Sequence, residues 1–375
     1  MEVIIMLKKI MLVMVLSLLN INAYTVELVQ IPDGVLIRAI PSFDRTQELK
    51  AYINNNPIKV VYENGILEAF IPQEDYCNHP RYYAIQEYQP PKDVNLDYLC
   101  VENTSNIGIV FITDTQKYHE YHKKAAQYIQ DNILPKFNIR LIINGGDLVH
   151  TSLLKEWIPY RQIASEYYSS KIPLVPVVGN HDYRKDPKLY NFKFFYGSSS
   201  TDKTYYLITL DNLHIIVLNS NYKSLTTKEL NDQEQWLQNT LESIDAKNPV
   251  VITFHHPPYG SLFYVDISSW ARVYMLKKIM PIIYKYPNVK LLLNGHTHIF
   301  ERLEINNVNI LIGGAAGGYL LPFYLYKFFK QPKFRSAQIR RTLSVLNYDK
   351  QKLELSVQSI DFLQQQIVDE FTINY

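Results

Sequence analysis

Five short polar clusters, each placed directly after a run of apolar residues, constrain the fold more than any other feature of this sequence. The clusters occupy residues 113–116, 145–150, 179–182, 255–258 and 295–298. The apolar runs before them are continuous rather than alternating, as expected for strands that are buried on both faces. Loops at strand ends are where α/β folds assemble their sites. The sequence therefore predicts an α/β domain with one composite site.

The segments between the clusters support this fold class. Apolar strands are expected at 109–112, 140–143 and 174–178, with helical stretches at about 118–133 and 156–168 between them. Further strands are expected at 214–218, 250–254, 289–293, 309–312, 342–347 and 353–360, the last two as an antiparallel pair. Such an alternation of strands and helices predicts a layered α/β domain.

The region before the first cluster differs from the rest of the chain. Residues 24–105 contain short β-prone runs separated by turn signals such as Pro-Asp-Gly and Glu-Asn-Gly. This pattern predicts a small β-sandwich-like domain. We therefore expect three parts: a signal peptide at 1–23, the small all-β domain at 24–105, and a catalytic domain at 106–375.

The first 23 residues have the pattern of an export signal. Lys8 and Lys9 precede a short apolar run at 10–19, and a plausible cleavage site follows Ala23. The run is shorter than the ~20 residues that span a bilayer, so we expect a cleaved signal and a secreted or periplasmic protein; an uncleaved anchor is the alternative. In an oxidising compartment Cys77 and Cys100 would be able to form a disulfide, the alternative being two unrelated buried thiols.

The residue types in the five clusters are those of a two-metal site. Two cations about 3.5–4 Å apart need a shared carboxylate and a mixed oxygen and nitrogen shell. Imidazole suits Zn and Fe, whereas carboxylate and amide oxygens suit harder ions. A set of Asp, Asn and His side chains therefore predicts two divalent or trivalent metal ions as cofactors, with Fe, Mn or Zn favoured over Ca.

The ordered set of clusters resembles the calcineurin-like metallophosphoesterase superfamily, and within it the purple acid phosphatase-like branch, over about residues 107–320. The resemblance implies an α/β fold with two mixed sheets packed together and helices outside, a four-layer α/β/β/α sandwich, with an N-terminal β-domain in several members. It also implies hydrolysis of phosphate esters by a water that the metals activate. A phosphomonoesterase is the leading interpretation. A phosphodiesterase acting on a nucleotide or lipid headgroup, a degenerate non-catalytic binding protein, and an adhesin or structural module are the alternatives.

The resemblance also implies roles for individual residues, by motif position. Ligands of the first metal would be Asp114 and His298, with Asp147 as the bridging carboxylate. Ligands of the second metal would be Asn180, His255 and His296. His181 resembles the non-ligand histidine that contacts the phosphate and protonates the leaving group, and Asp182 is placed to orient His181.

Two positions depart from the family pattern. Gln116 stands where many members have histidine, and its amide oxygen would either ligate the first metal or hydrogen-bond a metal-bound water. His150 stands where purple acid phosphatases have a tyrosine, so the purple ferric colour is not expected. His150 would be a replacement ligand or a residue that supports the ligands. His256 would contact substrate or support its loop.

Several other features have a less specific interpretation. His119 and His122 share one face of a predicted helix and are expected at the surface. The glycine-rich run at 313–318 would be a tight turn or a loop near the phosphate. The aromatic segment 319–329 is expected to pack between domains, with a lid over the site or membrane-surface contact as alternatives. A net charge of +2 without a dense basic run favours a small phosphorylated substrate over an obligate nucleic-acid partner.

Overall fold

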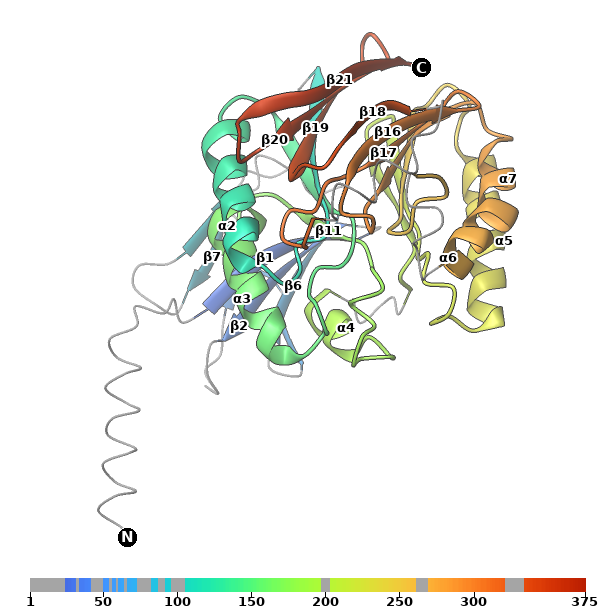
Figure 1. Cartoon of the computed structure of the whole chain (residues 1–375). Coiled ribbons are helices and arrows are strands. Elements are labelled where there is room, and N and C mark those ends of the chain that lie inside the picture. The colour runs from blue at the N-terminus through green and yellow to red at the C-terminus, as the bar shows by residue number, and fades with distance from the viewer. Residues whose placement is uncertain are drawn as a thin grey trace, which may run out of the picture.

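The computed structural model describes residues 105–196, 203–260, 269–320 and 334–375, together with eight strands between residues 24 and 95. Two mixed sheets lie face to face at the centre of this part of the chain, and helices cover both outer faces (Figure 1). This is the α/β/β/α arrangement that the family resemblance implies.

The first sheet has ten strands. Its centre is the parallel set β9 (Asn106–Ile112), β10 (Ile139–Asn144) and β11 (Leu174–Pro176). On one side of β9 follow the antiparallel strands β19 (Thr342–Asp349), β20 (Glu354–Asp361) and β21 (Gln366–Asn374). The pairing of β19 with β20 confirms the antiparallel pair expected from the sequence.

The strands before residue 96 divide between two sheets. On the far side of β11, the first sheet continues through β1 (Tyr24–Ile31), β2 (Gly34–Pro41), β6 (Ile66–Pro72) and β5 (Val60–Glu63). A separate antiparallel sheet contains β4 (Asn56–Ile58), β3 (Lys50–Ile53), β7 (Tyr82–Gln86) and β8 (Lys92–Asn95). Half of these strands thus extend the first sheet, while the domain boundary after residue 105 stays a prediction.

The second sheet has seven strands and supplies the other half of the sandwich. In spatial order they are β12 (Tyr206–Leu210), β13 (Leu213–Val217), β14 (Val250–Thr253), β15 (Val289–Asn294), β17 (Val308–Ile312), β16 (Phe300–Ile305) and β18 (Phe334–Gln338). β13, β14, β15 and β17 run parallel. Their carboxyl ends therefore open at one edge.

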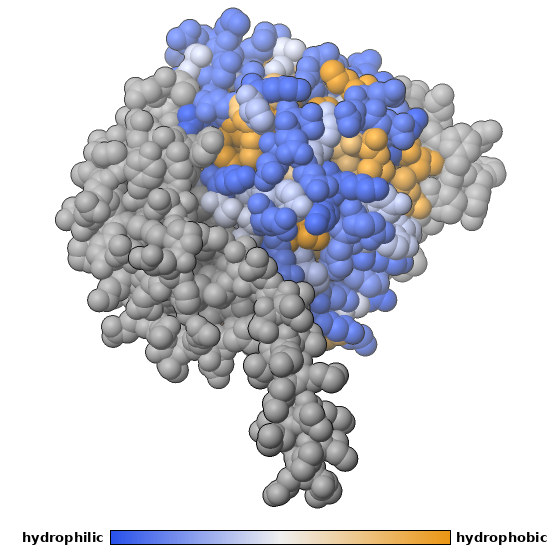
Figure 2. Space-filling model, turned by 90° about the vertical axis from the view of Figure 1, so that its left-hand side faces the viewer, coloured by the Kyte–Doolittle hydropathy of each residue, from blue (hydrophilic) through white to orange (hydrophobic). Residues whose placement is uncertain are grey.

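Helices cover the two outer faces. Beside the first sheet lie α2 (His119–Tyr128) with the π-helical turn η3 (Ile129–Ile133), α3 (Leu154–Ala164) with η4 (Ser165–Ser169), and α4 (Tyr190–Tyr196). Beside the second sheet lie α5 (Thr227–Ser243), α6 (Ser269–Tyr274), η5 (Met275–Ile279) and α7 (Met280–Ile283) (Figure 1). The side of the molecule that carries α2 is mainly hydrophilic in its described part (Figure 2).

Helix α5 has no counterpart among the helical segments expected from the sequence. It begins with a capping box, in which Thr226 Oγ1 accepts from the N–H of Glu229 at 3.2 Å and the Glu229 carboxylate accepts from the N–H of Thr226 at 2.7 Å. A Thr-x-x-Glu pattern is a recognised helix-start signal. The sequence therefore contained the information for this helix.

Three apolar cores hold the four layers together. Alternate residues of β9 explain the arrangement: Val110 and Ile112 pack toward α2 and α3, whereas Ile109 and Phe111 pack toward the second sheet. The third core joins the second sheet to α5, η5 and α7. Burial of both faces is the physical reason why the strand reads as a continuous apolar run.

His122 lies in the first core and not at the surface, so the expectation for this residue is wrong. Its side chain is fully buried, its ring stacks on Tyr160 at 5.2 Å, and Nε2 lies 3.0 Å from the hydroxyl of Tyr168. His119, one turn earlier, is half-buried. Helical spacing shows which residues share a face of α2, but not whether that face is buried. In the fold, α2 packs against α3, where aromatic side chains accommodate the imidazole of His122.

We expect His122→Phe to flatten the loss of stability in acid. Burial lowers the pKa of His122 from 6.5 to about 3, so below pH 6.5 the unfolded chain binds a proton that the folded chain does not. The free energy of unfolding therefore decreases as the pH is lowered, and this one group accounts for about 2 kcal/mol of the decrease between pH 7.5 and pH 5. Urea midpoints of the metal-free wild type and variant at both pH values test this. An equal loss in both proteins would contradict it.

Some sequence expectations concern residues outside the described ranges: the signal at 1–23, Cys77 and Cys100, and most of the segment 319–329. They remain predictions. Within the described ranges, none of the helices has the length and apolar character that crossing a membrane requires.

Candidate metal centre

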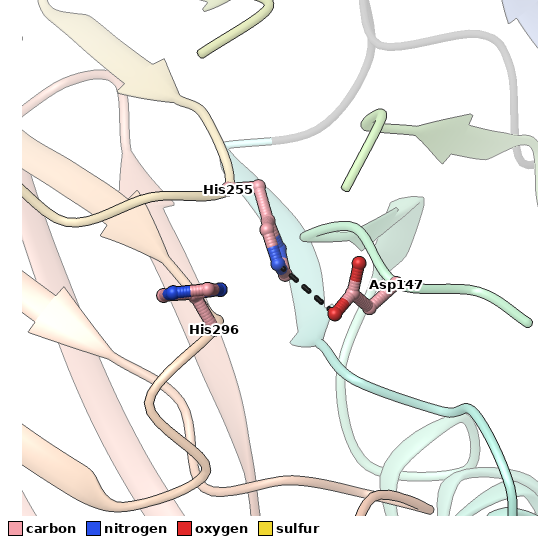
Figure 3. A group of neighbouring side chains, drawn as sticks. All are labelled: Asp147, His255 and His296. Carbon is pink, nitrogen blue, oxygen red and sulfur yellow. Dashed lines mark ion pairs between the residues drawn. The ribbon is translucent and has the colours of Figure 1, made fainter. Parts of the chain in front are cut away.

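The five polar clusters meet at the carboxyl ends of β9, β10, β11, β14 and β15. Ligand-type atoms converge there in two groups, within each of which the atoms lie no more than 4.8 Å apart. The groups consist of Asp114, Asp147 and His298, and of Asp147, His255 and His296. Figure 3 shows the second group, with His255 and His296 arriving from the second sheet and Asp147 from the first. Asp147 belongs to both groups, so its carboxylate is the one that they share.

The backbone at these positions is unusual. Asp114, Asp147, His296 and His298 all have a left-handed conformation, with φ between 51° and 75°. Such a conformation costs roughly 1–3 kcal/mol for a residue other than glycine. It turns the chain sharply at a strand end and directs each side chain toward the others. Four strained residues at one place indicate that the surrounding structure fixes the site rather than leaving it to adjust.

Backbone carbonyls orient two of the histidines. The Nδ1–H of His255 donates to the carbonyl oxygen of Gly145 at 2.9 Å, and that of His298 donates to the carbonyl oxygen of Tyr319 at 2.6 Å. In the neutral ring this leaves Nε2 as a lone-pair donor. Nε2 of His255 lies 3.2 Å from Asp147 Oδ2, and Nε2 of His298 lies 3.3 Å from Asp114 Oδ1. Both rings are thus prepared for metal ligation.

Asn180 lies beside the second group, in contact with its member His296. The side-chain oxygen of Asn180 lies 2.9 Å from Nδ1 of His296, and the N–H of His296 donates to the Asp114 carboxylate at 3.0 Å. Nε2 of His255 is buried, and the Asp147 carboxylate at 3.2 Å is its one polar neighbour among the described residues, without hydrogen-bond geometry. A buried nitrogen in this state fits a metal ligand, because a bound cation would satisfy it. The donor set therefore fits a pair of cations.

Charge is strongly coupled inside the site. Burial opposes the negative charge of Asp147, but the neighbouring His255 and His181 hold the pKa of this carboxyl well below its usual range. Burial likewise lowers the pKa of His255, and the Asp147 charge more than reverses this, raising the pKa to about 9. The carboxylate thus attracts whatever positive charge is available, which is the electrostatic condition for holding cations.

Gln116 and His150, the two positions that depart from the family pattern, are hydrogen-bonded to each other. The side-chain oxygen of Gln116 accepts from Nδ1 of His150 at 3.0 Å, while its Nε2 donates to Asp147 Oδ2 at 3.1 Å and lies 3.3 Å from Nε2 of His298. Burial lowers the pKa of His150. Metal ligation by either residue stays a prediction, but both contact the predicted ligands through this chain of bonds.

His181 is fixed beside the bridging carboxylate. Its N–H donates to Asp147 Oδ1 at 2.7 Å, its Nδ1–H donates to the carbonyl oxygen of His150 at 2.7 Å, and its ring stacks on that of His150 at 4.8 Å. Nε2 lies 3.9 Å from Asp147 Oδ2. The side chain remains 18% exposed, so part of the imidazole is open to solvent.

Asp182 does not orient His181, so that prediction is wrong. Its buried carboxylate accepts four backbone N–H groups at 2.8–3.3 Å, those of Gly179, Asp147, Leu148 and Val149. These bonds tie the turn that carries Asp147 to the turn that carries His181. A carboxylate with all its acceptor positions used by backbone has none left for the imidazole, whose Nδ1 is bonded to the His150 carbonyl oxygen instead.

His256 and the loop that supports it were only partly foreseen. The ring of His256 is buried, 4.4 Å from the ring of His296, and Nδ1 lies 2.8 Å from Ser220 Oγ. Ser220 belongs to the Asn-Ser-Asn sequence at 219–221 that follows β13, a sixth polar cluster after an apolar strand. The pattern that identified the other clusters would have found it. Of the two roles expected for His256, this contact favours support of its loop over contact with substrate.

Comparison with known proteins gives the family. A sequence profile described as calcineurin-like phosphoesterase (Metallophos) matches residues 107–300, which is 194 of the 375 residues and contains all the predicted ligands. The chain belongs to the calcineurin-like phosphoesterase family. The metallophosphoesterase resemblance expected from the sequence is thereby confirmed.

Individual members of the family resemble this phosphoesterase over part of its length. A probable purple acid phosphatase 20 of Arabidopsis thaliana is 27% identical over 197 residues, which cover 49% of this chain and 44% of the relative. The 3',5'-cyclic adenosine monophosphate phosphodiesterase CpdA of Escherichia coli K12 is 25% identical over 223 residues, covering 57% of this chain and 77% of the relative. The phosphatase match thus spans less than half of that protein's own length.

Solved structures show the same fold. Purple acid phosphatase PPD1 from yellow lupin superposes with a TM-score of 0.71 at 14% identity, covering 93% of this chain and 74% of the lupin chain. GAP50, described as the anchor in the inner membrane complex of Plasmodium, has a TM-score of 0.56 at 14% identity, covering 72% of this chain and 89% of its own. The fold class is therefore confirmed by an experimentally determined relative.

Proposed function

We propose that this phosphoesterase hydrolyses a phosphomonoester of a small molecule at a two-metal centre. The observation that carries the proposal is the sharing of Asp147 between two ligand groups, because a bridging carboxylate is what places two cations side by side. The likeness to a purple acid phosphatase supports the choice of a monoester. Manganese, iron and zinc fit the mixed imidazole and oxygen donors.

Different residues of the chain would bind the metals and donate the proton during hydrolysis. Asp114 and His298 would hold one cation, and Asn180, His255 and His296 the other, with Asp147 between them. When bound, the cations would neutralise phosphate charge and lower the pKa of an attacking water. His181 is held by the His150 carbonyl oxygen with Nε2 directed toward the centre. It would donate a hydrogen bond to the phosphate and a proton to the leaving oxygen.

We expect His181→Asn to lower turnover while leaving the metals in place. General acid catalysis contributes roughly 10²–10⁴-fold to rate, and His181 belongs to neither ligand group. Metal content by elemental analysis and kcat on p-nitrophenyl phosphate test this together. Retention of about two metals per chain with the lower kcat is the expected result. Loss of one metal in this variant would instead make His181 a ligand.

A phosphodiesterase is the second candidate, and the likeness to the cyclic nucleotide phosphodiesterase CpdA supports it. The substrates of the two candidates differ in the number of esterified phosphate oxygens: one in a monoester and two in a diester. The purified chain, loaded with Mn²⁺, Zn²⁺ or Fe²⁺, should be compared on p-nitrophenyl phosphate and bis-p-nitrophenyl phosphate. A kcat/KM higher for the monoester supports the proposal, whereas a preference for the diester selects the second candidate.

A binding protein without catalysis is the third interpretation of the site, with Gln116 in place of the usual histidine as its main support. Absence of bound metal and of turnover with every ion would select it. The retained ligand groups and the partly exposed His181 favour an enzyme.

We further propose export of the protein, from the charged and apolar pattern of residues 1–23. Expression in a secreting host, followed by N-terminal sequencing of the protein outside the cytoplasm, tests this. A mature chain that begins at Tyr24 is expected. Full-length protein that stays in the cytoplasm would contradict export.

A further inference from the structure

The glycine-rich run at residues 313–318 contacts the first ligand group, which consists of Asp114, Asp147 and His298. The N–H groups of Gly317 and Gly318 donate to the carbonyl oxygen of Asp114 at 2.8 and 2.7 Å. A Cβ atom on Gly318 would lie only 2.7 Å from Cε1 of His298, so the run and this ring are in close contact. The next residue, Tyr319, accepts the Nδ1–H of His298. The position of the run therefore sets the position of two predicted ligands.

The side chain of Arg341 is hydrogen-bonded to the same run. Its Nη1 donates to the carbonyl oxygens of Ala315 at 3.0 Å and Gly318 at 2.6 Å. Its guanidinium lies 3.9 Å from the ring centroid of Tyr121 in α2. The side chain is only 7% exposed, and it forms no ion pair within the described residues. A buried guanidinium is costly, so these carbonyl and ring contacts must offset its desolvation.

We propose that Arg341 is a positioning residue for the first metal, acting through the glycine-rich run on His298 and Asp114. This inference rests on the two-metal centre of the proposed function. Its contacts reach Asp114 and His298 of the first group. In the second group, His255 is held instead by the Gly145 carbonyl oxygen, and His296 pairs with the Asn180 amide and touches this path through its backbone N–H, which donates to the Asp114 carboxylate. The second metal should therefore be largely independent of Arg341.

The guanidinium shape is needed for this role. One nitrogen, Nη1, bonds both carbonyls while the flat guanidinium lies over the Tyr121 ring, whereas a lysine ammonium is a point charge on a flexible stem and has no flat face to place on the ring. Support of a ligand by such outer contacts is typically worth 10–100-fold in metal affinity. Both Arg341→Met and Arg341→Lys are therefore expected to weaken the first site, and the lysine variant keeps the charge if the methionine variant fails to fold.

The experiment is a Mn²⁺ titration of the metal-free full chain, with free Mn²⁺ measured by electron paramagnetic resonance. His298→Ala and Asn180→Ala serve as references that identify the first and second sites. We expect the Arg341 variants to weaken the first site by about 10–100-fold and the second by less than about threefold. Arg340→Met is the matched control, because its guanidinium is bonded to Asp361 and its side chain is 47% exposed, and it should leave both sites unchanged.

The outcomes separate this inference from the proposed function. Two unchanged sites in folded Arg341→Lys, or equal weakening of both sites, overturn the positioning role while leaving the two-metal centre intact. A wild-type chain that binds no Mn²⁺ overturns both. Selective loss of the first site, with a thermal midpoint close to that of Arg340→Met, is the result that a merely structural arginine would not give.

Discussion

Replacement of Asp147 by asparagine is expected to abolish the two-metal centre. The variant keeps the size of the side chain but removes the one negative charge that both ligand groups share. An amide offers a single weak oxygen donor, so it cannot bridge two cations as a carboxylate does. We expect bound metal to fall from about two to less than one per chain. We expect kcat/KM to fall by at least about 1,000-fold, which corresponds to about 4 kcal/mol of transition-state stabilisation.

Asp186→Asn is the matched control for this change. Asp186 is also buried and near the site in sequence, but its carboxylate caps α4 by accepting the N–H groups of Tyr190 and Asn191 at 2.9 and 2.7 Å. Its variant should retain both metals and most of the activity. Two tightly bound metals in Asp147→Asn would contradict the bridging role and move the shared ligand elsewhere, with Asp114 as the next candidate.

The fold and the convergence of the polar clusters were accessible from the sequence for one physical reason. A strand buried on both faces must be apolar throughout, so the polar residues that follow it stand out, as Asp114 does after Phe111 and Ile112. The same signal was present after β13 at Ser220 and was overlooked. Helix α5 was missed because its apolar residues are few, and only the Thr226 capping box marked its start.

The errors concern contacts that join distant parts of the chain. His122 and Asp182 were misplaced because a side chain's partners depend on how the elements pack, not on its neighbours in sequence. Asp182 accepts hydrogen bonds from a loop more than 30 residues away, and His122 contacts Tyr168, 46 residues away. Likewise, Gln116 and His150 looked like two separate departures from the family pattern. Their mutual hydrogen bond makes them one change, in which each supplies the partner that the other needs.

The corrected place of Asp182 predicts a large loss of stability for Asp182→Ala. Its carboxylate is the acceptor for four buried backbone N–H groups. Each buried donor left without a partner costs about 1–3 kcal/mol, although entry of water would reduce the sum. We expect the free energy of unfolding of the metal-free chain to fall by about 3–5 kcal/mol, as it does when a buried charged network is broken. Urea unfolding in the presence of a chelator measures this.

Two comparisons decide what Asp182 does. Asp182→Asn should cost less than half as much, because it keeps one acceptor oxygen and removes a charge that burial and the neighbouring Asp147 disfavour; the same two causes raise the pKa of Asp182 well above its ordinary value. Asp361→Ala should also cost less, because this buried aspartate accepts only two backbone N–H groups, those of Leu363 and Gln364, beside the partly exposed guanidinium of Arg340 at 3.4 Å. If Asp182→Ala left the stability of the metal-free chain unchanged and lowered kcat as much as His181→Asn does, the carboxylate would serve the histidine after all.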